Sequence, residues 1–212
     1  MRSRGRRLRV PWVVVGAALA LAAAGPGAPP GLRAGAGGPA SLAGQLLVAT
    51  EEIRDPRFHH TVIYMVRHDA TGALGLVVNR PLGETPLARL LELFGAESEG
   101  VGGSVRVHYG GPVEITRAFV LHTTDWASAE TTVVGGGIAV TSHPAVLDAI
   151  ARGQGPRRSL FALGYAGWAA RQLEGELERG AWISVPADEA LVFDDAAESK
   201  WRRATARRKI EI

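Results

Sequence analysis

The sequence predicts a single α+β domain built on a mixed β-sheet. Strand-like runs and helix-like segments follow one another at irregular intervals, not in repeated strand–helix–strand units, which disfavours a doubly wound parallel sheet. No Ser/Gly linker divides the chain after residue 40, and 212 residues with 46% hydrophobic content can supply one sizeable core. One folded domain is therefore expected over residues 41–206, followed by a basic tail over residues 207–212.

Strand-forming segments account for most of the predicted structure. The strongest is residues 60–67, because β-branched and aromatic residues fill it. Residues 73–79 return after the turn-forming residues 68–72, so the two segments are expected to form a hairpin. The other predicted strands are residues 45–50, 104–109, 117–122, 131–134, 138–141, 158–164, 182–185 and 190–193.

Helices are predicted from capping residues, apolar spacing and composition. A threonine followed by a proline is typical of a helix start, and apolar side chains then recur at helical spacing over residues 86–94. Ser142 is expected to cap a second helix over residues 143–152. A third helix is expected over residues 196–208 from its composition.

Residues 163–182 carry the most specific pattern in the chain. They are expected to form the end of a strand, a glycine turn over residues 164–167, a helix of two to three turns and a second strand. On that helix Trp168, Gln172 and Glu176 are four residues apart and would share one face, where they could contact a ligand or a partner. The alternative is that Trp168 packs against the sheet while the two polar side chains hydrogen-bond nearby backbone.

Two further turns are candidates for a shared binding site. Asn79 and Arg80 precede a proline at the end of one predicted strand, and Gly110 and Gly111 precede a proline at the end of another. If both turns lie at one rim of the sheet, an amide and a guanidinium would reach one pocket; otherwise they are ordinary strand-end turns. The candidate ligand- or partner-binding residues are Asn79, Arg80, Gly110, Gly111, Tyr165, Gly167, Trp168, Gln172 and Glu176.

The sequence contains no recognisable catalytic or metal-binding set. The absence of cysteine excludes disulfides, thiolate metal sites and cysteine nucleophiles, and the common serine-nucleophile and phosphate-binding motifs are absent. The six histidines fall in no known ligand spacing, so neither a metal nor a cofactor is predicted. The first hypothesis is a non-catalytic regulatory protein that binds an unknown protein or small-molecule ligand. The second is a hydrolase or transferase that uses Glu176 or a histidine as general base.

Positive charge is concentrated at the two ends of the chain. Residues 1–36 hold six arginines and no acidic residue, and residues 200–209 hold six basic residues, whereas the chain between them is net acidic. A nucleic-acid-binding face over the main body is therefore not expected. Residues 200–209 are interpreted as a solvated helix end or tail. Direct DNA binding through them is a third hypothesis, which predicts an affinity that falls steeply with salt.

The first 40 residues have the pattern of a signal peptide followed by a Gly/Pro/Ala linker. An arginine-rich start precedes an uncharged apolar run over residues 12–24, which is shorter than the about 20 residues of a membrane-spanning helix. If the leader is genuine, the protein is exported to the periplasm and has no transmembrane span after its removal. If the true start lies near Ser41, the protein is cytoplasmic.

A set of short motifs runs in order across residues 41–205. Its members are residues 44–49, 55–58, 72–81, 110–113, 120–122 and 163–168, with Gln172, Leu173, Glu174, Glu176, Trp182, Phe193 and Trp201. In this combination the chain resembles the YqgE/AlgH family of bacterial proteins. The resemblance implies a bifurcated sheet curled into a pseudo-barrel with flanking helices, and the designation transcriptional regulator for a family that lacks an agreed biochemical activity.

The chain departs from the family pattern in two places. Glu51 and Glu52 stand where family members typically carry a proline, so the loop after the first strand is expected to differ. The leader is the second departure, because members usually look cytoplasmic.

Overall fold

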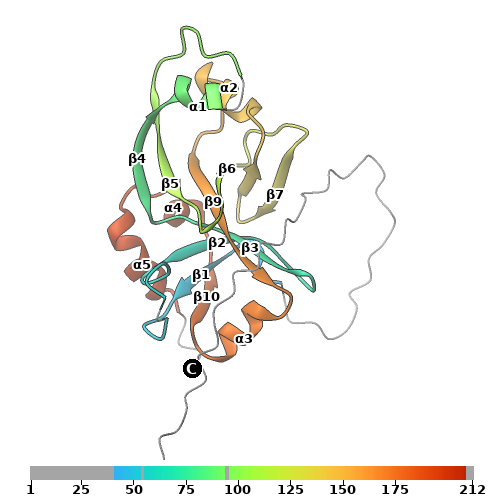
Figure 1. Cartoon of the computed structure of the whole chain (residues 1–212), viewed down its shortest axis with the longest axis vertical. Helices are drawn as coiled ribbons and strands as arrows, with labels where there is room; N and C mark the ends of the chain where they lie inside the picture. The colour runs from blue at the N-terminus through green and yellow to red at the C-terminus, as the bar shows by residue number, and fades with distance from the viewer. Residues whose placement is uncertain (1–40, 54, 94–95, 209–212) are drawn as a thin grey trace, which may run out of the picture.

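The computed structural model describes residues 41–53, 55–93 and 96–208, which form a ten-stranded mixed sheet curled into a half-barrel with helices around it (Figure 1). The predicted α+β class and curled, bifurcated sheet are confirmed. The predicted leader lies outside the described residues.

The strands are β1 (Gln45–Ala49), β2 (Val62–Asp69), β3 (Gly72–Val77), β4 (Pro81–Pro86), β5 (Ser104–Tyr109), β6 (Val113–Thr123), β7 (Thr131–Gly135), β8 (Ile138–Thr141), β9 (Ser159–Ala169) and β10 (Trp182–Pro186). The helices are α1 (Leu87–Leu93), α2 (Ala145–Ala151), α3 (Gln172–Glu178), α4 (Glu189–Val192) and α5 (Ala197–Thr205).

The sheet divides at β9. Hydrogen-bonded neighbours follow the order β10-β1-β2-β3-β9-β6-β8-β7 in antiparallel pairs, while β4 and β5 form a branch in which β5 runs parallel to β9. The first part of β9 pairs with β5 and β6, and its last part pairs with β3. Figure 1 shows β9 as the orange strand that runs from the upper to the lower half of the molecule. This strand therefore joins the two halves of the fold.

A left-handed glycine redirects β9 between these two pairings. Gly164 has a φ of 72°, which L side chains avoid, and a Cβ at this position would lie 2.4 Å from the carbonyl oxygen of Gly111. Before the bend, Phe161 packs in a cluster with side chains of α1 and α2. After the bend, Trp168 packs in a different cluster with Leu173 of α3. One strand thus contributes to separate cores.

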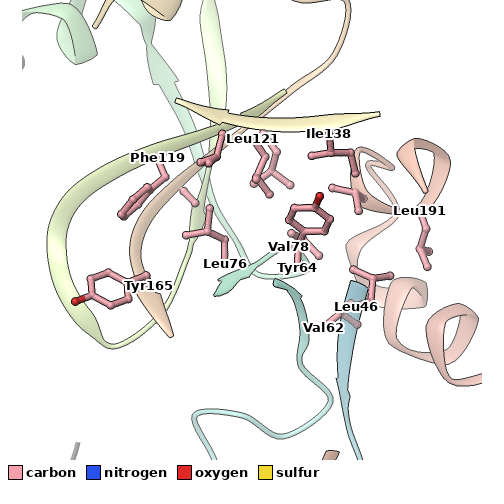
Figure 2. Close-up of a cluster of buried hydrophobic side chains, with 14 of the residues drawn as sticks. Leu46, Val62, Tyr64, Leu76, Val78, Phe119, Leu121, Ile138, Tyr165 and Leu191 are labelled. Atoms are coloured by element: carbon pink, nitrogen blue, oxygen red, sulfur yellow. The ribbon is translucent and has the colours of Figure 1, made fainter. Parts of the chain in front are cut away.

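The largest apolar cluster lies within the curl of the sheet. Figure 2 shows Leu76, Leu121 and Ile138 converging on it around the ring of Tyr64. The Tyr64 hydroxyl donates a hydrogen bond to the carbonyl of Gly135 at 2.9 Å, and burial raises the pKa of Tyr64. The polar end of this buried side chain is therefore paired, as the low-polarity interior requires.

The predicted strand over residues 190–193 is wrong. This segment belongs to α4, because the Asp188 carboxylate caps the helix by accepting a hydrogen bond from the Leu191 N–H at 2.8 Å. A four-residue apolar run does not distinguish a buried strand from one turn of a buried helix.

Two predicted helix starts are also displaced. The helix expected from residue 86 begins at Leu87, because residues 81–86 form β4 alongside β5. Ser142 does not cap α2, which follows Pro144 without a side-chain cap. The helices are short, and none in the described part of the chain is long and apolar enough to cross a membrane.

The glycine turn predicted over residues 164–167 is wrong as well. β9 continues through these residues to Ala169, and the chain reverses at Arg171, which has a φ of 64°. Trp168 therefore stands on the strand and not on the face of α3. It still reaches Glu176, but across the turn instead of along a helix.

Lys200 is buried, so it does not belong to a solvated basic cluster. Its side chain is 0% exposed, and its Nζ donates to the carbonyls of Val78 and Val192 at 2.8 Å each. Burial lowers the pKa of Lys200 to about 8. The two carbonyls accept two of the N–H groups of this amine.

The lowered pKa of Lys200 predicts a stability that rises with pH in the alkaline range. Between pH 8 and 10.5 the unfolded chain binds a proton at this residue that the folded chain does not, so raising the pH favours folding. The free energy of unfolding should increase by about 2 kcal/mol from pH 8 to pH 10 relative to a Lys200→Met variant. Urea denaturation of both proteins at each pH measures the difference. A wild-type curve parallel to that of the variant would contradict the lowered pKa.

Candidate functional site

A pocket of about 240 Å³ opens beside α3. Its lining comes from the loop after β1, from α3 and from the start of β10. The lining residues are Glu52, Ile53, Asp55, Glu176, Arg179, Ala181 and Trp182. The Thr50 hydroxyl donates to the carbonyl of Gly180 at 2.6 Å, which ties the loop to the end of α3 across 130 positions of sequence. The pocket therefore exists only in the folded chain.

Glu176 is the buried carboxylate of this pocket, with 2% of its surface exposed. Its Oε2 accepts hydrogen bonds from the indole N–H of Trp168 at 2.9 Å and of Trp182 at 2.8 Å. Its Oε1 accepts from the side-chain amide of Gln172 at 3.0 Å. An ionised carboxylate offers about four acceptor positions. One position, on Oε1, is thus left for a further donor.

The local structure of residues 168–182 positions the three side chains that donate hydrogen bonds to Glu176. Trp168 lies near the end of β9, Trp182 begins β10, and Gln172 opens α3 between them. The Gln172 Oε1 accepts the N–H of Ala169 at 3.1 Å, which turns its amide nitrogen toward Glu176. The two indole rings meet edge to face at 6.0 Å. Glu176 therefore ties α3 to two strands and also lines the pocket.

The other charges of the pocket are partly balanced by neighbours. Asp55 pairs with Arg57 at 2.6 Å, and the hydrogen bonds from Arg57 hold the pKa of Asp55 below its usual value. Glu52 and Arg179 are exposed at the rim. The buried carboxylate of Glu176 has no charged side chain as a hydrogen-bond partner among the described residues.

The side chains of Asn79 and Arg80 form hydrogen bonds with the backbone at the end of the loop that precedes β2. The Asn79 Oδ1 accepts the N–H of Val62 at 2.9 Å, and its Nδ2 donates to the carbonyl of His60 at 2.9 Å. Arg80 donates from Nη2 to the carbonyl of His59 at 2.7 Å. Both side chains therefore shape the backbone of residues 59–62.

Gly110 and Gly111 allow close contact between β5, β6 and β9. The Gly110 N–H donates to the carbonyl of Leu163 at 2.7 Å. A Cβ on Gly111 would lie 2.1 Å from the carbonyl carbon of Tyr165. Because neither glycine has a side chain, the backbones of these strands can approach closely at this point.

Tyr165 and Gly167 lie beside this junction. The Tyr165 hydroxyl donates to Oε1 of Glu114 at 3.2 Å. A Cβ on Gly167 would lie 3.1 Å from the Tyr165 ring. The predicted site residues therefore fall into two groups. Asn79, Arg80, Gly110, Gly111, Tyr165 and Gly167 surround the junction of β3, β5 and β9. Trp168 and Gln172 hold Glu176, and of these three only Glu176 lines the pocket.

Sequence reasoning missed six residues that line the pocket: Glu52, Ile53, Asp55, Arg179, Ala181 and Trp182. Three belong to the loop after β1, which precedes α3 by more than a hundred positions. No periodicity or motif links the two segments. Two signals in the sequence concern this loop: the family motif over residues 55–58 and the departure from the family pattern at Glu51 and Glu52.

The sequence profile of a family described as AlgH-like matches residues 46–212. The chain belongs to the AlgH-like family. The resemblance stated from the motifs is therefore confirmed. The UPF0301 protein of Methylococcus capsulatus is 44% identical over 167 residues, which are 79% of this chain and 91% of that protein. The UPF0301 protein of Rhodospirillum rubrum is 46% identical over 170 residues, 80% and 88% of the respective chains.

Two solved structures share the AlgH-like fold. The solution structure of the AlgH protein from Pseudomonas aeruginosa matches with a TM-score of 0.69 at 42% identity, over 81% of this chain and 90% of that one. The crystal structure of a Corynebacterium diphtheriae protein matches with a TM-score of 0.64 over 80% and 88% of the two chains. Its identity of 18% supports the fold alone.

Proposed function

We propose that this AlgH-like protein is a non-catalytic binding protein and that the pocket beside α3 takes a small cationic group, an ammonium or a guanidinium. The main observation in support is the environment of Glu176, a buried carboxylate that accepts hydrogen bonds from three neutral donors. Because its hydrogen-bond donors are all neutral, a cation that reaches this buried carboxylate gains more than it would at an exposed one.

The size and lining of the pocket support a small ligand or one side chain of a partner. A volume of about 240 Å³ lies below the roughly 300–1,000 Å³ of pockets for drug-sized ligands. Trp182 adds an indole surface, which attracts cations. The free acceptor position on Glu176 Oε1 would receive an N–H of the ligand. Lysine, arginine and simple amines carry this chemistry.

The alternative is a hydrolase or transferase in which Glu176 acts as general base. The described lining residues include no hydroxyl, imidazole or amine, and of the two other carboxylates Asp55 is paired with Arg57 while Glu52 is exposed. Three of the acceptor positions of Glu176 are already occupied. Both observations favour binding over catalysis at this pocket.

Direct DNA binding through the C-terminal basic residues has less support from the geometry. Lys200 is buried, Arg203 pairs with Asp194, and Arg207 pairs with Asp188 at 2.6 Å. These partners leave less free charge for phosphates. We therefore attribute any regulatory role to ligand or protein binding, in the periplasm if the leader is genuine and in the cytoplasm if translation starts near Ser41.

The indole N–H signals of the protein offer a direct test of the pocket. Propylammonium or methylguanidinium, titrated into the ¹⁵N-labelled protein, should shift the NMR signals of Trp168 and Trp182 in a saturable way. Trp201, whose indole donates to the carbonyl of Ala49, should move less. Glu176→Gln should abolish the saturation, whereas Glu178→Gln on the same helix should retain it.

Sodium acetate serves as the matched anionic probe. Equal shifts with acetate, or no saturable shift with either cation, would remove the proposed cation site.

A further inference from the structure

The loop between β1 and β2 brings one carboxylate and two imidazoles together at the surface. His60 Nε2 lies 3.0 Å from Glu51 Oε1, and His59 Nε2 lies 3.6 Å from Glu51 Oε2. One ligand atom from each residue lies within 4.8 Å of the others. In a tetrahedral site with metal–ligand bonds of about 2.0–2.1 Å, neighbouring ligand atoms are about 3.3 Å apart. The separations of 3.0 and 3.6 Å between Glu51 and the two histidines, each to a different carboxylate oxygen, are close to this value.

We propose that Glu51, His59 and His60 bind a divalent transition-metal ion of the zinc class. Two imidazole nitrogens and a carboxylate oxygen are a typical zinc ligand set, whereas magnesium and calcium prefer oxygen alone. Three protein ligands leave a fourth tetrahedral position for water or for a group of a bound molecule. Sequence spacing does not reveal this set, because Glu51 is separated from the adjacent histidines by a turn of the loop.

His60 is held rigidly in the position of a ligand. Its φ of 52° is left-handed, a conformation that residues with a side chain adopt mainly where the surroundings enforce it. Its ring stacks on Trp201 with the centroids 3.9 Å apart. Trp201 is itself fixed by the hydrogen bond from its indole to the carbonyl of Ala49 at 2.7 Å.

Asn79 and Arg80 position the histidine pair through its backbone. Asn79 donates to the carbonyl of His60, and Arg80 donates to the carbonyl of His59. These two residues, predicted to face a ligand, are thus better described as positioning residues for the two imidazoles.

Metal binding requires a small rearrangement of His59. The rings of His59 and His60 are stacked at 3.9 Å, but the lone pairs of imidazole nitrogens lie in the ring planes, so one metal ion cannot engage both rings in that arrangement. The His59 side chain is 53% exposed and can turn. His60 and Glu51 form the prearranged pair, and His59 closes onto the ion.

The hydrogen bond between His60 and Glu51 marks where the ion would bind. A metal ion would take the place of the proton between His60 Nε2 and Glu51 Oε1.

The metal site is independent of the cation pocket beside α3. None of its three residues lines that pocket. A failure of one proposal therefore leaves the other intact.

Calorimetric titration of the full-length protein with Zn²⁺ in a non-chelating buffer tests the metal site. One equivalent should bind, and Co²⁺ should give the visible absorption of a tetrahedral complex. Glu51→Gln and His60→Asn should each lower the Zn²⁺ affinity by more than about tenfold. Asparagine is chosen at residue 60 because it tolerates the left-handed backbone.

His143→Asn is the matched control, because His143 is also exposed but lies elsewhere in the fold. It should bind Zn²⁺ as the wild type does. Melting curves of each variant by circular dichroism establish that it is folded, and the exposed Glu51 keeps the test decisive if His60→Asn is unstable. No Zn²⁺ uptake by the wild type, unchanged affinity in Glu51→Gln, or an equal loss in His143→Asn would overturn the proposal.

Discussion

Glu176→Ala is expected to lower the free energy of unfolding by about 4 kcal/mol. The substitution leaves the indole N–H groups of Trp168 and Trp182 without their acceptor in a buried site. Each buried donor without a partner costs about 1–3 kcal/mol, and the loss of the Gln172 hydrogen bond and of side-chain contacts adds to this. Urea denaturation followed by circular dichroism measures the change.

Glu178→Ala provides the matched control for this variant. Glu178 lies on the same helix but is exposed, so its substitution should change the stability by less than about 0.5 kcal/mol. If Glu176→Ala were as mild as the control, Glu176 would not be the residue that ties α3 to β9 and β10.

Gly110→Ala is expected to destabilise the fold by about 3 kcal/mol. A Cβ at this position would lie 2.2 Å from the carbonyl oxygen of Gly164 and 3.1 Å from the carbonyl oxygen of Leu163. Both neighbours are backbone atoms of β9, so no side-chain rotation relieves the clash, and the strands must separate. The same denaturation experiment reports the effect.

Gly102→Ala separates this steric effect from the general effect of replacing glycine. Neither Gly102 nor Gly110 has a left-handed φ, but nothing lies within 4 Å of a Cβ built on Gly102. Its replacement should be neutral or slightly stabilising, because alanine restricts the unfolded chain. Wild-type stability of Gly110→Ala would mean that β5 and β9 do not approach as closely as described.

The sequence predicted most strands because their signal is local. The β2 and β3 hairpin follows from β-branched runs on either side of a turn. The failures arose where a local signal is ambiguous: α4 is too short to show a period, and β4 contains two prolines that argue against a strand, yet lies at the sheet edge beside β5.

The candidate site was predicted only where its residues are linked by a local sequence signal. Gln172 and Glu176 share a helix and so meet by their spacing. Trp168 was placed on the wrong element, because two glycines in β9 were interpreted as a turn. The loop residues of the pocket and the Glu51–His59–His60 cluster gave no spacing signal, since loop conformation depends on distant partners such as Asn79 and Trp201.

The sequence by itself determined the family, the α+β class and the segment that holds Glu176, because these depend on motifs and periodicities within short stretches. The tertiary structure alone decided which side chains share a site. It buried Lys200 against two carbonyls, surrounded Glu176 with two indoles and set Glu51 against two histidines. Such groupings depend on strand pairing and loop closure between segments far apart in the chain, which no local pattern encodes.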